Sequence, residues 1–451
     1  MIIHRLRLWA ILAVVPAVLG IVISAAPLPY AGAGTADEPY LLASADDFAS
    51  LADLVNAGNE EAAAASYRLT RDIDFAGVAY TPIGDSPAHP FRGTLDGDGF
   101  AVRNLAITSD SPYAGLFGVG FNVAVTDLIL ENASLAVTCD GTVTAGLLFG
   151  SYEGNAAGEG LRMTRVQADG TLTVDSGLNV RVGGLIGYYK VTGNTASVSD
   201  CCVEADITSV AATTSYVGGL IGTVESGLRL TNCVVTGRAY GETTGDALPY
   251  TGGVAARFYL DDWIGSASLL EAKTCETVAS SIVCAVEPIA VGRYGTYTGN
   301  IFARLQDATA TTCWCDARFA VPSTRYNVNG TPLAQSALFD LAFLQESVGL
   351  DFENTWTMLF DRPVLRRKRP SIACRIGESA LETLPVSCGA CRLIAAYRDA
   401  SGRFILAGTA VSDGETPVSF PLPEEGTLTL FALDEALRPL CAPKTVAASG
   451  K

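Results

Sequence analysis

The sequence predicts an all-β protein whose main body is a parallel β-solenoid. A short glycine-centred signature recurs along the middle of the chain, at residues 114–118, 145–150, 182–187, 217–222 and 251–255. Its spacing of 31 to 37 residues is typical of stacked arrays, in which each unit buries its apolar face only against its neighbours. The segments between the signatures are short, β-branched and bounded by Gly, Asn, Asp and Ser, which favours strands over helices.

A second signature is coupled to the first. A hydroxyl residue opens it and an apolar residue follows two places later, at residues 126–130, 164–168, 199–203 and 231–235. Each repeat therefore carries two strand-like segments. Strands stacked about 4.8 Å apart, coil on coil, form the wall of such a solenoid.

The signature glycines have two interpretations. In the structural one, the coils pack so closely or turn so sharply that a Cβ would clash, whereas in the functional one the bare backbone faces a ligand. The structural interpretation is favoured, because Leu185 and Leu220 follow the glycines and would fill the interior. It predicts that the glycines lie in a common row along the solenoid axis. They are Gly115, Gly146, Gly183, Gly184, Gly218, Gly219, Gly252 and Gly253.

These glycine signatures resemble the GLUG repeats of bacterial secreted and surface proteins. The lead-in to the repeats is similar as well, through residues 39–42, 51–58, 67–75, 82–84 and 91–99. The resemblance spans about residues 39–365, ends at Trp356 and 363–365, and weakens between 254 and 335. It implies a right-handed parallel β-helix displayed outside a bacterial cell, often in adhesion-like proteins, and it supplies no catalytic residues.

We expect five parts along the chain. Residues 1–33 are a signal peptide or an N-terminal anchor, because Arg5 and Arg7 precede an uncharged apolar run and a small-residue site allows cleavage after Ala33. Ser44 caps a short helix that covers the open end of the solenoid. The remaining parts are an N-terminal cap with that helix at 34–66, the repeat β-helix at 67–365 with a late helix at 335–345, a linker at 366–387 and a small antiparallel β-sandwich at 388–451.

Charge restricts the partners. The net charge of −17, from 47 acidic and 30 basic side chains, argues against nucleic acid, whose phosphates require clustered Lys and Arg. No P-loop is present, so neither a nucleotide nor another cofactor is expected. The basic run at 366–369 is interpreted as a solvated linker, with a protease-sensitive junction as the alternative.

The chain has 12 cysteines, which fall into two groups. Cys201 and Cys233 occupy the position of Leu128 and Val166 in earlier repeats, and Cys275 and Cys313 occupy a comparable place, so these are interpreted as small buried core residues. Disulfides between neighbouring rungs and a metal are the alternatives. In the tail, Cys374, Cys388, Cys391 and Cys441 are interpreted as a disulfide or packed thiols, with zinc or redox chemistry as the alternatives.

Histidine is almost absent, which removes most enzyme mechanisms. His4 lies in the leader and His89 in a proline-bounded loop, so a Ser-His-Asp or Cys-His arrangement is not expected. Carboxylate catalysis on a polysaccharide remains an alternative, with Asp96 and Asp98 as candidates. Their alternation with glycine favours a turn between strands instead.

The sequence therefore predicts a non-enzymatic extracellular or cell-surface repeat protein that acts as a binding or adhesion scaffold. Its expected partners are glycans, host surface proteins or the cell envelope, with membrane contact only through an uncleaved N-terminal segment. A polysaccharide lyase or glycoside hydrolase and a passive structural spacer are the alternatives. Polar residues expected on outer loops or faces are Thr171, Thr173, Thr213, Thr214, Ser215, Thr243 and Thr244.

Overall fold

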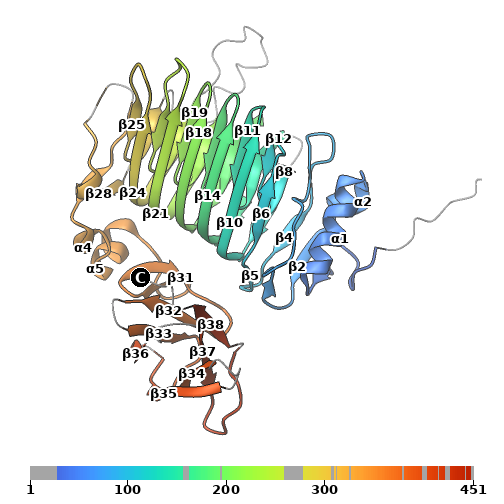
Figure 1. Ribbon diagram of the computed structural model, residues 1–451, viewed down its shortest axis with the longest axis vertical. Helices are drawn as coiled ribbons and strands as arrows, with labels where there is room; N and C mark the ends of the chain where they lie inside the picture. Colours follow the sequence, from blue (N-terminus) through green and yellow to red (C-terminus); the bar gives the residue numbers. More distant parts are fainter. Residues whose placement is uncertain are drawn as a thin grey trace, which may run out of the picture.

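The fold is a parallel β-helix with a small antiparallel module beside it. The computed structural model describes residues 28–155, 162–192, 196–258, 278–305, 309–310, 312–322, 324, 327–377, 380–398, 404–414, 416–421, 427–441 and 443–447. Strands dominate these ranges, and most pair in parallel with the strands one coil earlier and one coil later. Figure 1 shows the coils stacked from the blue N-terminal end to the yellow end. The fold class predicted by the repeat spacing is confirmed.

The largest sheet, which we call sheet A, contains two columns of strands joined at a corner. The first column contains β1 (Tyr40–Leu42), β2 (Ser66–Leu69), β4 (Thr94–Asp96), β9 (Ala124–Thr126), β13 (Arg162–Thr164), β17 (Ala196–Ser199), the first parts of β21 (Leu228–Thr243) and β24 (Val278–Val291), and β27 (Thr309–Ala310). The second contains β3 (Ile73–Asp74), β5 (Ala101–Arg103), β6 (Ala106–Ser109), β10 (Ile129–Cys139), β14 (Gln167–Ser176), β18 (Cys202–Ala211), the later parts of β21 and β24, β28 (Cys313–Asp316) and β29 (Thr331–Leu333).

Two further sheets complete each coil. Sheet C contains β7 (Tyr113–Ala114), β11 (Val143–Gly146), β15 (Val180–Gly183), β19 (Ser215–Gly218), β22 (Tyr250–Gly252) and β25 (Tyr297–Gly299). Sheet B contains β8 (Phe117–Phe121), β12 (Phe149–Asn155), β16 (Ile186–Thr192), β20 (Ile221–Val224), β23 (Ala255–Phe258) and β26 (Phe302–Leu305). One continuous apolar core runs along the axis between the three sheets, because equivalent residues such as Val182 and Val217 lie in register.

The second sequence signature marks the corner between the two columns of sheet A. Its second residue adopts a left-handed backbone, with φ of 52° at Asp127, 54° at Arg165, 53° at Asp200 and 55° at Asn232. Asp and Asn tolerate this conformation better than most residues do. The residue that follows is then fully buried in the core, as at Cys201.

The N-terminal end is covered by two helices, α1 (Ala45–Asn56) and α2 (Glu60–Ala64). Ser44 and Asp47 form a capping box at the start of α1, which confirms the helix and cap expected there. The expected boundary after Ala33 is wrong for the fold, because Leu28 and Tyr30 are 8% exposed and belong to the core. The hydrophobic run of the leader lies outside the described residues.

The segment before α1 is held by specific contacts. The Tyr30 hydroxyl donates to the Asp47 carbonyl over 3.2 Å, and the Tyr30 ring packs edge-on against Tyr67 with centroids 5.8 Å apart. Gly34 accepts a backbone hydrogen bond from Ser66. Residues 28–34 are therefore part of the N-terminal cap. Among the described residues, none lies in a helix whose length and apolar character would let it cross a membrane.

The other end is covered by short helical turns, and the single helix expected at 335–345 is wrong. The chain forms η1 (Ala317–Phe319), α4 (Gln335–Leu338), α5 (Leu341–Phe343) and η2 (Leu344–Val348). Asp340 interrupts the helix, because its side chain caps α5 by accepting from the Phe343 amide. The hairpin of β30 (Trp356–Leu359) and β31 (Arg362–Leu365) follows. Trp356 and Leu338 pack on the outer face of sheet A against Val234 and Val283.

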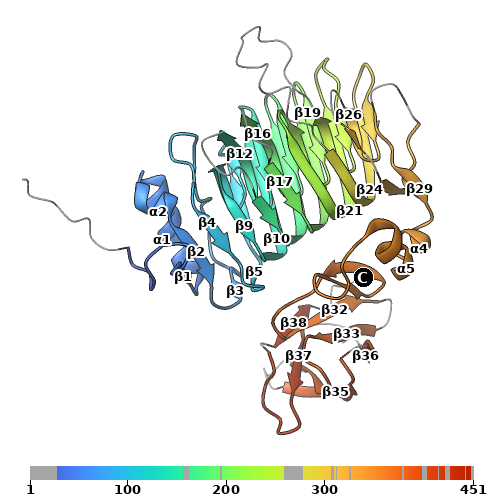
Figure 2. The same ribbon diagram turned by 180° about the vertical axis from the view of Figure 1, so that it is seen from behind.

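The C-terminal module is an antiparallel β-sandwich that begins earlier than expected. One sheet contains β32 (Ser371–Ile376), β33 (Ala380–Val386) and β36 (Val418–Pro421), and the other contains β34 (Cys391–Arg398), β35 (Phe404–Ser412), β37 (Thr427–Leu433) and β38 (Lys444–Ala447). The linker expected at 366–387 is wrong, because Ile372 and Leu381 from β32 and β33 fill the core of this module. Figures 1 and 2 show the module beside the coils, off the solenoid axis.

Candidate functional site

The signature glycines lie in a row along the solenoid axis. Gly146, Gly183, Gly218, Gly252 and Gly299 pair in register across β11, β15, β19, β22 and β25. At this row the chain turns from sheet C into sheet B, and the backbones of the two sheets approach each other closely.

Side chains do not fit at these glycines. A Cβ on Gly183 would meet the Ile186 carbonyl oxygen, and one on Gly219 would meet the Gly253 carbonyl oxygen. The same obstruction by backbone oxygen occurs at Gly115, Gly146, Gly184, Gly218, Gly252 and Gly253. The glycines therefore allow close backbone packing inside the solenoid.

The two candidate catalytic carboxylates lie at the sheet A corner and are both engaged in ion pairs. Asp96 is 2.9 Å from the Arg68 guanidinium, and its side chain accepts from the Asp98 amide. Asp98 has a left-handed backbone, φ 46°, and its carboxylate is 2.7 Å from Arg369. This is the geometry of a turn whose carboxylates bind arginines, not of a free acid and base.

The basic run Arg366–Arg369, which we call the basic segment, was expected to be solvated, and that expectation is wrong. Arg369 pairs with Asp98, Lys368 lies 3.1 Å from Asp127, and Arg367 pairs with Glu131. The Arg367 and Glu131 side chains are only 14% and 15% exposed. The segment therefore docks along the acidic corner of the early coils, where opposite charge compensates its burial.

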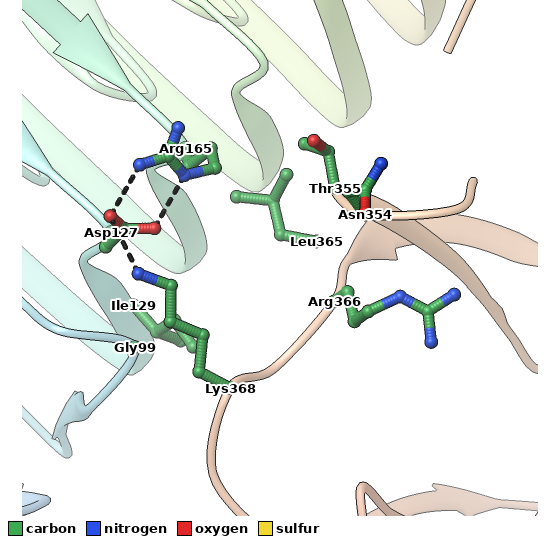
Figure 3. Close-up of a pocket in the computed structure, with 9 residues that line it drawn as sticks. All are labelled: Gly99, Asp127, Ile129, Arg165, Asn354, Thr355, Leu365, Arg366 and Lys368. Carbon is green, nitrogen blue, oxygen red and sulfur yellow. Dashed lines mark hydrogen bonds and ion pairs between the residues drawn. The ribbon is translucent and has the colours of Figure 1, made fainter. Parts of the chain in front are cut away.

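A first cleft of about 210 Å³ lies where the basic segment meets sheet A. Figure 3 shows Asp127 between Arg165 and Lys368, and Arg165 donates two hydrogen bonds of 2.6 Å to the Asp127 carboxylate. Burial alone would raise the pKa of Asp127, but the hydrogen bonds from Arg165 and Lys368 outweigh burial and lower it. Since both oxygens of Asp127 are engaged, the cleft is a seam between the basic segment and the coils.

A second cleft, of about 250 Å³, lies on the same face at the other side of the β30–β31 hairpin. Its charged lining residues come from sheet A, η1 and β31: Glu204, Asp206, Arg238, Glu287, Arg318 and Arg362. Glu204 pairs with Arg362, and Arg238 lies 3.9 Å from Glu287. The Asp206 side chain is exposed and, within the described residues, makes no hydrogen bond or ion pair.

Glu204 and Asp206 were not singled out from the sequence, although a signal for them exists. Polar residues alternate with Val203, Ala205 and Ile207 along β18, and that period of two places both carboxylates on the outer face. The cleft itself could not be predicted from the sequence, because the residues that face β18 across it lie more than 100 positions later in the chain.

Some of the polar residues expected outside lie inside. Thr171, Thr173, Thr213 and Thr244 are exposed and Thr214 is partly exposed, but Ser215 and Thr243 are buried. Ser215 is hydrogen-bonded to Ser209 over 3.0 Å, and the Thr243 hydroxyl donates to the Ala247 carbonyl over 2.9 Å. Those local partners make the burial of the two hydroxyls possible.

Three of the four solenoid cysteines expected in the core, Cys201, Cys233 and Cys313, lie there. Cys201 and Cys233 are fully buried on neighbouring rungs, and their thiols donate to the Ser199 and Thr231 carbonyl oxygens over 3.3 and 3.4 Å. Burial raises the pKa of Cys313 to about 12, which suits an unreactive thiol. Cys275 lies outside the described residues.

The tail cysteines do not form a metal site. No group of three or more His, Cys, Asp or Glu able to hold a metal ion occurs among the described residues, which include all four tail thiols. The Cys388 thiol donates to the Ser371 and Val386 carbonyl oxygens, each over 3.5 Å. Cys374 and Cys391 lie on β32 and β34 of the same module.

Comparison with known proteins finds partial relatives and a similar fold but does not define the family of this chain. No protein-family model matches it. The chain is 31% identical to "Halomucin" from Haloquadratum walsbyi over an alignment of 232 residues, which covers 44% of this chain and 2% of that protein. A stretch of 129 residues, 28% of this chain, is 33% identical to 14% of a "Putative Gly-rich membrane protein" from Evansella cellulosilytica. The chain thus spans a small part of either relative.

The fold has a counterpart among solved structures. A "putative immunoglobulin A1 protease" from Bacteroides ovatus superposes with a TM-score of 0.55 at 16% identity, over 75% of this chain and 95% of that one. At this identity the similarity concerns the fold alone.

Proposed function

We propose that this chain is a surface-displayed GLUG-repeat protein that acts as a binding or adhesion scaffold, with the outer face of sheet A as its contact surface. The observation that carries the proposal is the register of charged side chains on that face. Asp206, Arg238 and Glu287 lie side by side on successive coils. Strands spaced about 4.8 Å apart present such rows to an extended ligand as repeated, closely spaced contacts.

Location outside the cell is part of the proposal. The names of the two relatives, a halomucin and a membrane protein, fit a surface protein. The N-terminal sequence, read as a signal peptide or anchor, supplies the route of export. Glycans, host surface proteins and the cell envelope are the partners that such a location offers.

An enzyme acting on polysaccharides is the second candidate. It is favoured by the second cleft, where Glu204 and Asp206 project from one face of β18 and Asp206 has no partner among the described residues. Carboxylates placed in this way are the groups that glycoside cleavage requires. Asp96 and Asp98 are less suited, because arginines pair with both of them, whereas in the second cleft Arg362 pairs with Glu204 alone.

Binding and turnover measured together test the proposal. Purified protein is applied to a panel of glycans, host surface proteins and cell-envelope fractions, and release of reducing ends is followed on every glycan that binds. The scaffold predicts binding without release, and binding that weakens in the Glu204→Gln, Asp206→Asn double variant.

Asp175→Asn is the matched control, because Asp175 is an exposed carboxylate on sheet A outside the second cleft. Release of reducing ends that disappears in the double variant establishes the enzyme instead. If the protein shows neither binding nor release, it acts as a passive spacer, and both candidate functions are wrong.

A further inference from the structure

Strand β35 is the outer strand of its sheet in the C-terminal module. It pairs with β34 on one side, and among the described residues no strand pairs with its other side. Figures 1 and 2 place β35 at the end of the module that lies farthest from the coils. The free side of β35 therefore presents backbone donors and acceptors to which a further strand can bind.

The composition of β35 lacks the charges and prolines that block pairing at other sheet edges. Its nine residues, FILAGTAVS, include no ionisable side chain and no proline. Leu406 and Val411 are 61% and 78% exposed. Long, uncharged edge strands that expose apolar side chains are the ones that pair with other chains.

The other three edges of the module are better protected. β38 has four residues and begins with Lys444, β36 has four residues and ends with Pro421, and β32 carries Arg375. Short length, charge and proline each discourage the addition of a strand. β35 is therefore the edge at which the module is open to association.

The exposed side chains of β35 are arranged so that the strand matches itself. The pairing with β34 skips Ala407, which is therefore a bulge. Because of this extra residue, Leu406, Thr409 and Val411 lie on the same outer face of the sheet, since their partners on β34 are every second residue. Once the bulge is left out, Thr409 is midway between Leu406 and Val411.

We propose that β35 pairs in antiparallel fashion with β35 of a second copy of this chain, which joins the two modules through one continuous sheet. A two-fold axis at Thr409 sets the two Thr409 side chains opposite each other and Leu406 of each copy opposite Val411 of the other. Directly opposed threonine and apolar pairs stabilise antiparallel strands. Such a contact uses the same surface on both copies, so it closes at a dimer.

Charge favours a second copy as the occupant of this edge. The chain carries a net charge of −17, so two copies repel each other over most of their surfaces. β35 has no ionisable side chain and lies at the far end of the module from the coils, so two copies meet there with little repulsion. A strongly charged partner finds no opposite charge along this strand. Because the contact is one strand wide, the dimer should be weak and should dissociate on dilution.

Sedimentation of the full-length chain between about 1 μM and about 300 μM tests the proposal. We expect monomer at the lower concentration and dimer at the upper one. The Leu406→Lys, Val411→Lys double variant places lysines opposite each other, and we expect it to weaken the dimer by about tenfold or more. Leu437→Lys is the matched control, because Leu437 is 55% exposed but lies outside β35, and this variant should dimerise like the wild type.

A crosslink reports the register of the two strands. Opposed residues on antiparallel strands have Cα atoms about 4.5–5.5 Å apart, a distance that a disulfide spans. After oxidation of the Thr409→Cys variant, peptide mapping should find position 409 of one copy joined to position 409 of the other. A wild type that stays monomeric at every concentration overturns the proposal, as does a dimer that the double variant leaves unchanged. A dimeric Thr409→Cys variant without this crosslink excludes the proposed pairing.

Discussion

The Lys368 ammonium lies 3.1 Å from the Asp127 carboxylate, so the segment that follows the last coil is bound to one of the first coils. Arg367 and Glu131, which are 236 positions apart, pair at the same seam. These contacts hold the segment before the C-terminal module against the early coils, so the module lies beside the β-helix. Figure 2 shows this arrangement from behind.

Breaking the buried pair should release that seam. Arg367→Met removes an ion-pair partner of Glu131 in a site that is almost closed to water. We expect the free energy of unfolding to fall by about 3 kcal/mol, the lower end for a broken buried pair, because the Arg103 guanidinium still lies 2.6 Å from the Glu131 carboxylate. Trypsin should then cleave faster within residues 366–369. Arg369→Met is the control, because its pair with Asp98 is exposed and is worth about 0–1 kcal/mol. Equal cleavage of both variants would contradict the role assigned to Arg367.

The stability of the corner should depend on pH through Asp127. The pKa of its carboxyl is lowered below the ordinary 3.8, so the ionised form is favoured by folding. Its contribution is fully present above the unfolded pKa and is lost as the pH falls through the folded pKa. We therefore expect the difference in unfolding free energy between wild type and Asp127→Asn to be constant near neutral pH and to shrink below about pH 4. Denaturant titrations at a series of pH values measure it, and a constant difference down to pH 2 would exclude this linkage.

A side chain at the glycine row should destabilise the coils. In Gly219→Val, the new side chain would meet the Gly253 carbonyl oxygen and the side chains of Val235 and Val286. We expect the free energy of unfolding to fall by about 2–3 kcal/mol. Gly141→Ala is the control, because its Cβ would have only an ordinary contact of 3.6 Å with the Cys139 sulfur. An unchanged melting temperature in Gly219→Val would disprove the close approach.

The mature N-terminus should lie at or before Leu28. Cleavage after Ala33 would remove Tyr30, whose ring is buried against Tyr40 and Tyr67. N-terminal sequencing of the exported protein measures the site directly, and a chain that starts at Gly34 would show that the fold does not require this segment. A protein made without residues 28–33 should melt at a lower temperature than one that retains them, because it lacks those apolar contacts.

The sequence by itself determined the repeat architecture of this protein. The period of the glycine signature predicts stacked coils, and the capping residues around Ser44 predict α1, because both signals depend on local conformation and on contacts between neighbouring coils. The burial of Cys201 and Cys233 followed from the same register. Asp340 also carries a local capping signal, and this signal favours a new helix start at Leu341 over the continuous helix predicted at 335–345.

The tertiary structure decided how the parts meet. Whether Arg367 is solvated or buried depends on Glu131, which lies 236 positions earlier in the chain. Charge pairing acts between residues distant in sequence, and no periodic pattern encodes such partners. The second cleft arises in the same way, since β18 supplies one wall and the turns after the last coils supply the other.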